Sequence, residues 1–129
     1  MNDTNRSLAL AASILFLAVA FGAFGAHGLK ERLDPEKLAI YQTAVQYQFW
    51  HGLGLALVAV ITRQYGECRL LTWSGRLMAA GVLIFSGSLY VLAMTGIRWL
   101  GAITPIGGIC FLMGWLLLAI FGWRSSNFQ

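Results

Sequence analysis

Four apolar segments, each about twenty residues long, constrain the fold of this chain more than any other feature of its sequence. They cover roughly residues 7–27, 43–62, 74–95 and 99–123. A helix needs about 20 predominantly apolar residues to cross the hydrocarbon core of a bilayer. Only helices and closed barrels satisfy every backbone hydrogen-bonding group there. We therefore predict an all-α membrane protein, in which residues 1–129 form a single domain and a bundle of four transmembrane helices.

The composition excludes the soluble classes. Hydrophobic residues make up 58% of the chain and charged residues 11%, against about 45–50% and about 25% in soluble domains. A soluble protein could not cover its surface with so few charges. The net charge of +4 comes from nine Lys and Arg residues scattered between the apolar segments. This is typical of cations that flank membrane spans, and it predicts no nucleic-acid partner.

The second apolar segment is preceded by a strong helix start. Asp34 can cap a helix whose first turn holds Pro35 and Glu36, which suits the positive end of the helix. A helix from Pro35 to Thr62 would measure ~42 Å and exceed the membrane core by about 12 Å. We therefore expect residues 36–42 to form a short interfacial helix before the second span.

Four spans place both termini and the middle loop on the same side of the membrane. Five Lys or Arg residues lie on that side and four on the other. Because cytoplasmic segments carry the excess of Lys and Arg, we predict a multi-pass protein of the cell inner membrane with cytoplasmic termini.

Polar side chains of three spans fall at similar depths. At 1.5 Å per residue from the side of the termini, His51 lies ~16 Å deep and Gln48 and Tyr47 ~21–23 Å. Tyr47, Gln48 and His51 are also spaced to share one helix face. The same count of residues along the third and fourth spans places the remaining polar side chains ~18–26 Å deep. They belong to Ser86, Ser88, Tyr90 and Thr104.

This polar layer has two interpretations. Polar groups within a membrane tend to face the bundle interior and to mark function, so the layer is a candidate ligand-binding site for a small molecule, a lipid group or water. Alternatively, the side chains are interhelical hydrogen bonds, a common role of Ser, Thr, Gln and His. The second interpretation suits Ser86, Ser88 and Thr104 best, whereas His51 is costly to keep without a function.

His27, the other histidine, is included among the candidate ligand-binding residues, although it lies near the far end of the first span. Its axial distance from His51 is ~14 Å, which is too long for both to bind one haem iron or metal ion unless the first helix is broken. The alternative is that His27 caps carbonyls in the last helical turn. Cys68 and Cys110 are too far apart for a metal motif, so we predict no metal and no cofactor.

Pro105 is the strongest local irregularity of the fourth segment. It removes a backbone donor and disturbs the carbonyl of Gly101, which predicts a kink. Discontinuous helices of transporters contain such a break. The alternative is an ordinary proline kink, in which a Ser or Thr hydroxyl bonds to the freed backbone group.

The absence of catalytic motifs predicts that the chain is not an enzyme. No acid lies within an apolar segment, although proton-driven exporters use a carboxylate there. No catalytic triad, phosphate loop or dinucleotide fingerprint occurs. We expect a small-ligand-binding, lipid-binding or scaffold protein, with a small channel or transporter subunit as the alternative. Its small-residue faces also suit a homo-oligomer.

Sequence signatures in all four segments resemble one family, the domain of unknown function 423. This small bacterial inner-membrane family is related to eukaryotic transmembrane protein 256. The resemblance implies a four-helix integral membrane protein and no particular chemistry. The residues that carry it are Gly22-Ala23-Phe24-Gly25-Ala26-His27-Gly28-Leu29, Tyr41-Gln42-Thr43-Ala44 with Tyr47-Gln48 and His51, Phe85-Ser86-Gly87-Ser88-Leu89-Tyr90, and Thr104-Pro105-Ile106-Gly107-Gly108 with Phe111 and Gly114-Trp115.

Overall fold

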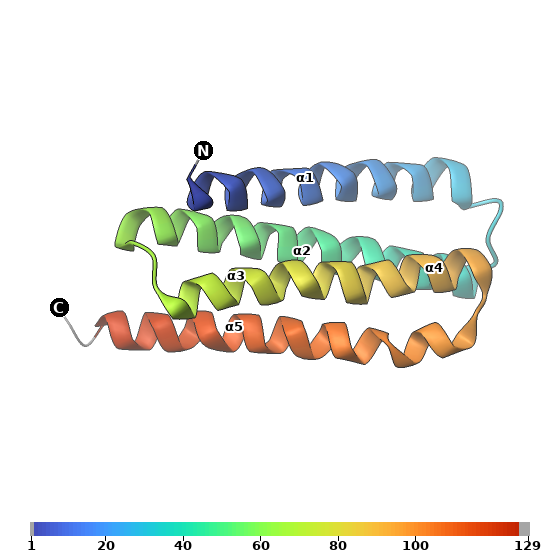
Figure 1. Cartoon of the computed structure of the whole chain (residues 1–129). Coiled ribbons are helices and arrows are strands. Elements are labelled where there is room, and N and C mark those ends of the chain that lie inside the picture. The colour runs from blue at the N-terminus through green and yellow to red at the C-terminus, as the bar shows by residue number, and fades with distance from the viewer. Residues whose placement is uncertain (1, 127–129) are drawn as a thin grey trace.

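Four long helices that run alternately in opposite directions form the protein (Figure 1). The structure is a computed structural model and describes residues 2–126. Each helix is long and apolar enough to cross a membrane, and both termini lie at the same end. The predicted all-α bundle of four spans is confirmed, with spans Asp3–Leu29, Pro35–Tyr65, Arg69–Thr95 and Arg98–Ser126.

Three of the spans contain a change of helix type. The first joins α1 (Asp3–Phe24) to a π-helical segment, Gly25–Leu29. The third joins α3 (Arg69–Gly81) to α4 (Gly87–Thr95) through a second π-helical segment, Val82–Ser86. The fourth begins with a 3₁₀ segment, Arg98–Ala102, before α5 (Thr104–Ser126). The second span is one α-helix, α2 (Pro35–Tyr65).

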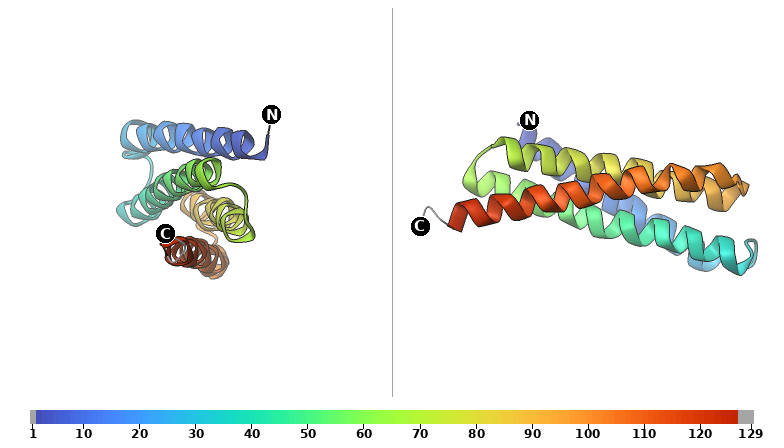
Figure 2. Two further views of the ribbon diagram at one scale, coloured as in Figure 1. Left: turned by 90° about the vertical axis from the view of Figure 1, so that its left-hand side faces the viewer. Right: turned by 90° about the horizontal axis from the view of Figure 1, so that it is seen from below.

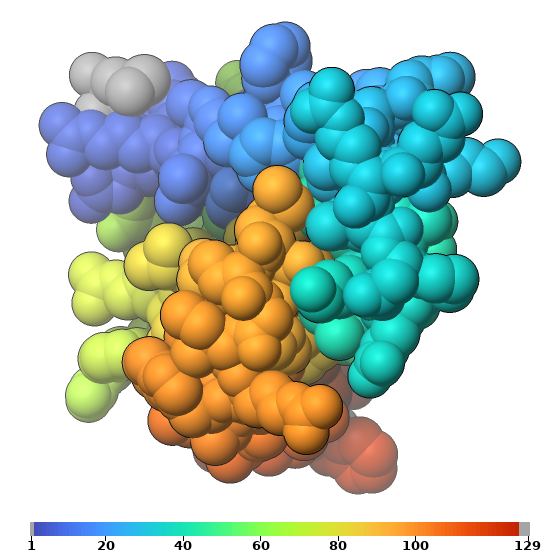
Figure 3. Space-filling model, turned by 90° about the vertical axis from the view of Figure 1, so that its right-hand side faces the viewer, coloured from blue at the N-terminus to red at the C-terminus, as the bar shows by residue number. Residues whose placement is uncertain are grey.

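The helices are not arranged as an evenly closed bundle. α1 packs against α2, while α5 packs against α3. Figure 2, in the view from the end that holds the termini, shows α1 and α5 on opposite sides of α2 and α3. At the other end, the connections between α1 and α2 and between α4 and α5 come together (Figure 3), and Lys37 lies beside Gly96.

The predicted short interfacial helix is not a separate element. Asp34 caps α2 as expected, and its side chain accepts a hydrogen bond of 2.9 Å from the backbone N–H of Lys37. Residues 36–42 then form the first turns of the same continuous helix. No glycine or proline interrupts the chain between Pro35 and Gly52, so nothing breaks the helix before the span begins.

The irregularity at Pro105 also differs from the predicted kink. Pro105 lies in the first turn of α5, where its missing N–H breaks no helical hydrogen bond. The break lies before it, in the 3₁₀ segment, where the N–H of Ile103 bonds to the carbonyl of Leu100 at 3.0 Å. Thr104 donates its hydroxyl to the same carbonyl at 3.3 Å. The prediction of a hydroxyl near the break is therefore correct. Gly101 also lies within the irregular stretch, but this stretch is a 3₁₀ segment that precedes α5 and not a kink within an α-helix.

Close helix contacts require small residues at two crossings. Ala11 and Ala18 of α1 are buried against α2. At Gly107 of α5, an added Cβ would collide with the backbone of Phe85. α5 can therefore approach the π-helical segment closely only because position 107 has no side chain.

Candidate functional site

Gln48 is the centre of a hydrogen-bond network that joins three helices. Its side-chain N–H donates to the carbonyl of Ile14 on α1 at 3.0 Å, and its oxygen accepts from the hydroxyl of Tyr90 on α4 at 2.6 Å. Tyr41 makes a second link, because its hydroxyl donates to the carbonyl of Phe21 at 2.6 Å. The structure thus brings together Gln48 and Tyr90, as their predicted depths indicated.

The three hydroxyls Ser86, Ser88 and Thr104 also pair across helices. Ser86 is buried and donates to the carbonyl of Ala44 on α2 at 2.7 Å. Ser88 and Thr104 share a hydrogen bond of 2.7 Å between their hydroxyl oxygens. These contacts match the interhelical hydrogen bonds that the residue types favoured.

His51 lies in an aromatic stack on another face of α2. Its ring is parallel to that of Phe111, with 3.5 Å between centroids, and Trp115 approaches it edge-on at 5.9 Å. Its Nδ1 lies 2.8 Å from the carbonyl of Tyr47, one turn back in the helix. Tyr47 itself stacks on Phe85 at 4.4 Å.

The prediction that Tyr47, Gln48 and His51 share one face is therefore only partly correct. Gln48 contacts α1 and α4, whereas Tyr47 and His51 contact aromatic rings of the third and fourth spans. Three residues correspond to less than a full turn, so positions 48 and 51 diverge enough to reach different neighbours.

His27 does not join the polar layer. It lies in the π-helical segment at the far end of the first span, and its side chain is exposed. Among residues 2–126 it makes no side-chain hydrogen bond to carbonyls of the last turn or to the layer residues. Six of the eight predicted site residues thus form three pairs, Gln48 with Tyr90, Ser88 with Thr104 and Tyr47 with His51. A role in binding a ligand stays a prediction.

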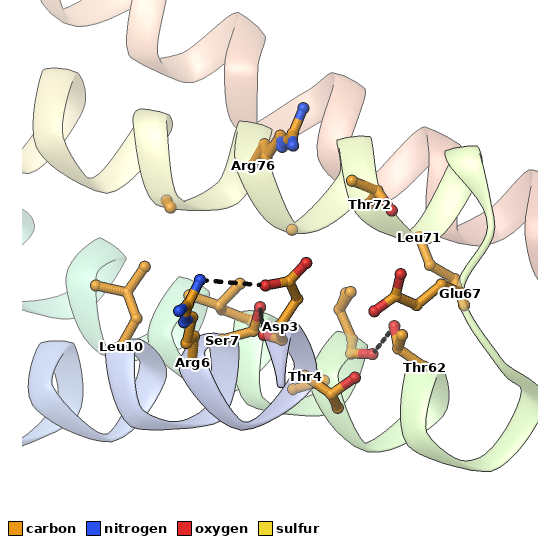
Figure 4. A pocket seen from close by; sticks show the side chains of 15 residues that line it. Asp3, Thr4, Arg6, Ser7, Leu10, Thr62, Glu67, Leu71, Thr72 and Arg76 are labelled. Carbon is orange, nitrogen blue, oxygen red and sulfur yellow. Dashed lines mark hydrogen bonds and ion pairs between the residues drawn. The ribbon is translucent and has the colours of Figure 1, made fainter. Parts of the chain in front are cut away.

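A cavity of about 350 Å³ lies instead near the end that holds the termini, between α1, α2 and α3 (Figure 4). None of the predicted site residues lines it. Its apolar wall is formed by Leu10, Leu55, Val58, Ala59, Leu71, Gly75 and Ala79, and its polar rim by Asp3, Thr4, Arg6, Ser7, Thr62, Glu67, Thr72 and Arg76.

The rim carries two cations and two anions. On α1, Arg6 and Asp3 form an exposed ion pair of 3.4 Å. Across the cavity, Glu67 precedes α3 and Arg76 belongs to it (Figure 4). The guanidinium of Arg76 lies over the ring of Trp73, 5.4 Å from its centroid. A shallow surface depression over the start of α3 adjoins the cavity and shares Glu67, Thr72 and Arg76 with it.

Sequence reasoning missed this cavity because its walls belong to segments far apart in the chain. From the sequence, the acids were considered only because they lie outside the apolar segments. The sequence did contain one signal: Asp3 and Arg6 precede the first apolar segment, and Glu67 precedes the third. Reasoning also missed Ser74, which is fully buried and donates to the carbonyl of Gly114 at 2.7 Å.

The described residues hold no group of three or more His, Cys, Asp or Glu side chains placed to bind one metal ion. Cys68 and Cys110 are free thiols. The chemistry available at the cavity is therefore ion pairing and hydrogen bonding at the rim, and apolar contact below it.

A family model described as a protein of unknown function, DUF423, matches residues 21–108. The chain belongs to this family. The matched region contains all eight predicted site residues, but it excludes Asp3, Arg6 and Leu10, which line the cavity on α1.

Several bacterial relatives support the membership. A UPF0382 membrane protein of Staphylococcus haemolyticus is 49% identical over 112 residues, which cover 86% of this chain and 89% of the relative. The UPF0382 membrane protein YwdK of Bacillus subtilis is 45% identical over 104 residues, or 81% and 85% of the two chains. No solved structure matches this chain. The protein is an integral membrane protein, in agreement with these names and with its four apolar helices.

Proposed function

We propose that this member of the DUF423 family binds a lipid-like amphiphile in the cavity between α1, α2 and α3. Its role is binding rather than catalysis, and its location is the inner membrane, with the termini and the cavity on the cytoplasmic side. In this proposal the polar layer serves as the scaffold that fixes the helices around the cavity.

The observation that carries the proposal is the composition of the cavity. Its volume of about 350 Å³ is within the usual range of small-molecule sites, about 300–1,000 Å³. Seven of its lining residues are apolar or small, and four are charged. A molecule with an apolar tail and a polar head satisfies both parts, whereas a fully polar or fully apolar molecule satisfies one.

The packing of α1 gives such a molecule a route from the bilayer. α1 packs mainly against α2, and the cavity lies where α1 faces α3 across an interval (Figure 4). A lipid can therefore enter sideways between these two helices without disturbing the contact between α3 and α5.

Filling the cavity tests the proposal. Ala79 lines it on α3, so Ala79→Phe should displace bound lipid, and retention after gentle purification should fall about tenfold, equivalent to about 1.4 kcal/mol. Native mass spectrometry measures the retained lipid. Leu83→Phe is the matched control, because Leu83 is 77% exposed on the same span, outside the cavity.

A second variant makes the test independent of the folding of the first. Leu10→Trp fills the cavity from α1, whose Leu10 is 48% exposed, and should also reduce retention. The proposal is wrong if wild-type protein retains no lipid, or if both cavity variants fold and retain as much as the control.

A further inference from the structure

The two facing walls of the cavity present their charged groups in the same order. On α1, Asp3 is nearest the end of the helix, Arg6 follows, and Leu10 lies deepest. On the opposite wall, Glu67 comes before α3, then Arg76, then Ala79. From the outside inward, each wall therefore offers a carboxylate and then a guanidinium; Leu10 and Ala79 lie deeper, and on the α3 wall Leu71 and Gly75 lie between the two charges.

On both walls the guanidinium residue lies deeper than the carboxylate residue, by less on α1 than on α3. At 1.5 Å per residue, Arg6 lies ~4–5 Å deeper than Asp3, and Arg76 lies ~10 Å deeper than the start of α3 at Arg69. Arginine side chains are long and can extend back toward the interface. Both guanidinium groups can thus reach a level just inside the carboxylates.

The rim charges are available to a ligand. Among residues 2–126, Glu67 and Arg76 take part in no ion pair, although the guanidinium of Arg76 lies over the ring of Trp73, and Arg6 pairs only with Asp3. The side chains of Arg6 and Asp3 are 67% and 77% exposed, and such surface pairs are worth only about 0–1 kcal/mol. A bound headgroup can therefore replace this pair at little cost.

We propose that the cavity binds a zwitterionic phospholipid with a primary ammonium headgroup, of the phosphatidylethanolamine type; this inference rests on the proposed function. Along such a lipid the ammonium is outermost, the phosphate is next and the acyl chains are deepest. The ammonium meets Glu67 and Asp3, the phosphate meets Arg6 and Arg76, and an acyl chain lies against the apolar wall.

The same order of charges disfavours two other lipid classes. An anionic lipid without an amine would bring its phosphate to the arginines but leave two carboxylates at the entrance without a cation. A choline headgroup carries a positive charge but no N–H, so it cannot donate the charge-assisted hydrogen bonds that an ammonium gives to carboxylates.

Competition between defined lipids tests the inference. The purified full-length protein is exchanged into nanodiscs of phosphatidylethanolamine, phosphatidylcholine and phosphatidylglycerol with identical acyl chains, and native mass spectrometry measures which lipid stays bound. We expect phosphatidylethanolamine to exceed each of the other two by about tenfold. Glu67→Gln and Arg76→Gln should each lower this preference.

Controls and a charge reversal separate recognition from misfolding. Arg63→Gln is the matched control, because Arg63 lies at the same end but does not line the cavity. Glu67→Lys should move the preference to phosphatidylglycerol, a gain that a misfolded protein would not show. Equal retention of the three lipids, or wild-type preference for phosphatidylglycerol, overturns the headgroup inference and leaves lipid binding intact. Retention of no lipid, by contrast, overturns the proposed function itself.

Discussion

Tyr90 and Gln48 connect α4 to α2 through a hydrogen bond of 2.6 Å from the phenolic hydroxyl to the amide oxygen. Gln48 is only 4% exposed, and its N–H is already engaged by the carbonyl of Ile14. No water is available in the hydrocarbon core to replace a lost partner. The stability of the three-helix contact therefore depends directly on the hydroxyl of Tyr90.

Tyr90→Phe should destabilise the bundle by about 1 kcal/mol. The substitution keeps the ring and its edge-on contacts with Phe21 and Tyr41, but leaves the oxygen of Gln48 without a donor. Buried unpaired groups cost about 1–3 kcal/mol, whereas interhelical hydrogen bonds in membranes average about 0.6 kcal/mol. Reversible unfolding in mixed bicelles measures the change.

Tyr47→Phe is the control for this prediction. Within residues 2–126 the hydroxyl of Tyr47 makes no hydrogen bond, so its removal should leave the free energy of unfolding unchanged. A double-mutant cycle with Gln48→Leu and Tyr90→Phe then isolates the pair. An equal loss in Tyr47→Phe and Tyr90→Phe would contradict the assigned role of the pair.

Gly107→Ala should destabilise the contact between α5 and the π-helical segment, whereas Gly108→Ala should not. A Cβ at position 107 would lie 2.8 Å from the Cα of Phe85. Because this atom belongs to the backbone, the clash can be relieved only if one of the two helices moves. Overpacking of this kind costs about 1–3 kcal/mol. At position 108 the nearest atoms of Phe85 are 3.9 Å away. Thermal unfolding of the two variants, compared with wild type, measures the difference; equal melting temperatures would show that α5 does not approach Phe85 closely.

The spans and the depth of the polar groups could be predicted because both depend on local chain geometry. The length of an apolar segment fixes whether it can cross the membrane. The rise per residue then places Gln48 level with Tyr90 and Ser88 level with Thr104, pairs that the structure brings into contact. The cap at Asp34 is equally local.

The direction of each side chain around its helix could not be predicted in the same way. Which neighbour Gln48 or His51 meets depends on how the helices are arranged, and several arrangements suit four spans of similar hydropathy. The cavity depends on the same arrangement, because it exists only where α1 faces α3. Ser74 was overlooked because nothing in its sequence context reveals the carbonyl of Gly114 that it meets.

Substitutions of His51 should distinguish its packing from ligand binding. His51→Phe keeps a flat ring against Phe111, but it enlarges the ring and removes the contact of Nδ1 with the carbonyl of Tyr47, so it should cost about 1 kcal/mol. His51→Ala removes the ring and should cost about 3 kcal/mol. If the predicted ligand-binding role of His51 is correct, His51→Phe should also lose a ligand that copurifies with wild type, which mass spectrometry detects. A stable His51→Phe protein with unchanged ligand content would contradict that role.

Labelling of Cys68 should establish the orientation, because Cys68 lies between α2 and α3 at the same end as the termini and the cavity. With Cys110, the other free thiol, changed to Ala, a membrane-impermeant maleimide should label Cys68 in inverted vesicles and not in intact cells. The reverse pattern is expected for Glu31→Cys in a chain that also carries Cys68→Ala, because residue 31 lies in the connection at the other end. The small excess of Lys and Arg on the side of the termini is the physical reason for this expectation. Labelling of Cys68 in intact cells would place the termini outside, and the charged rim of the cavity would then face the outer leaflet.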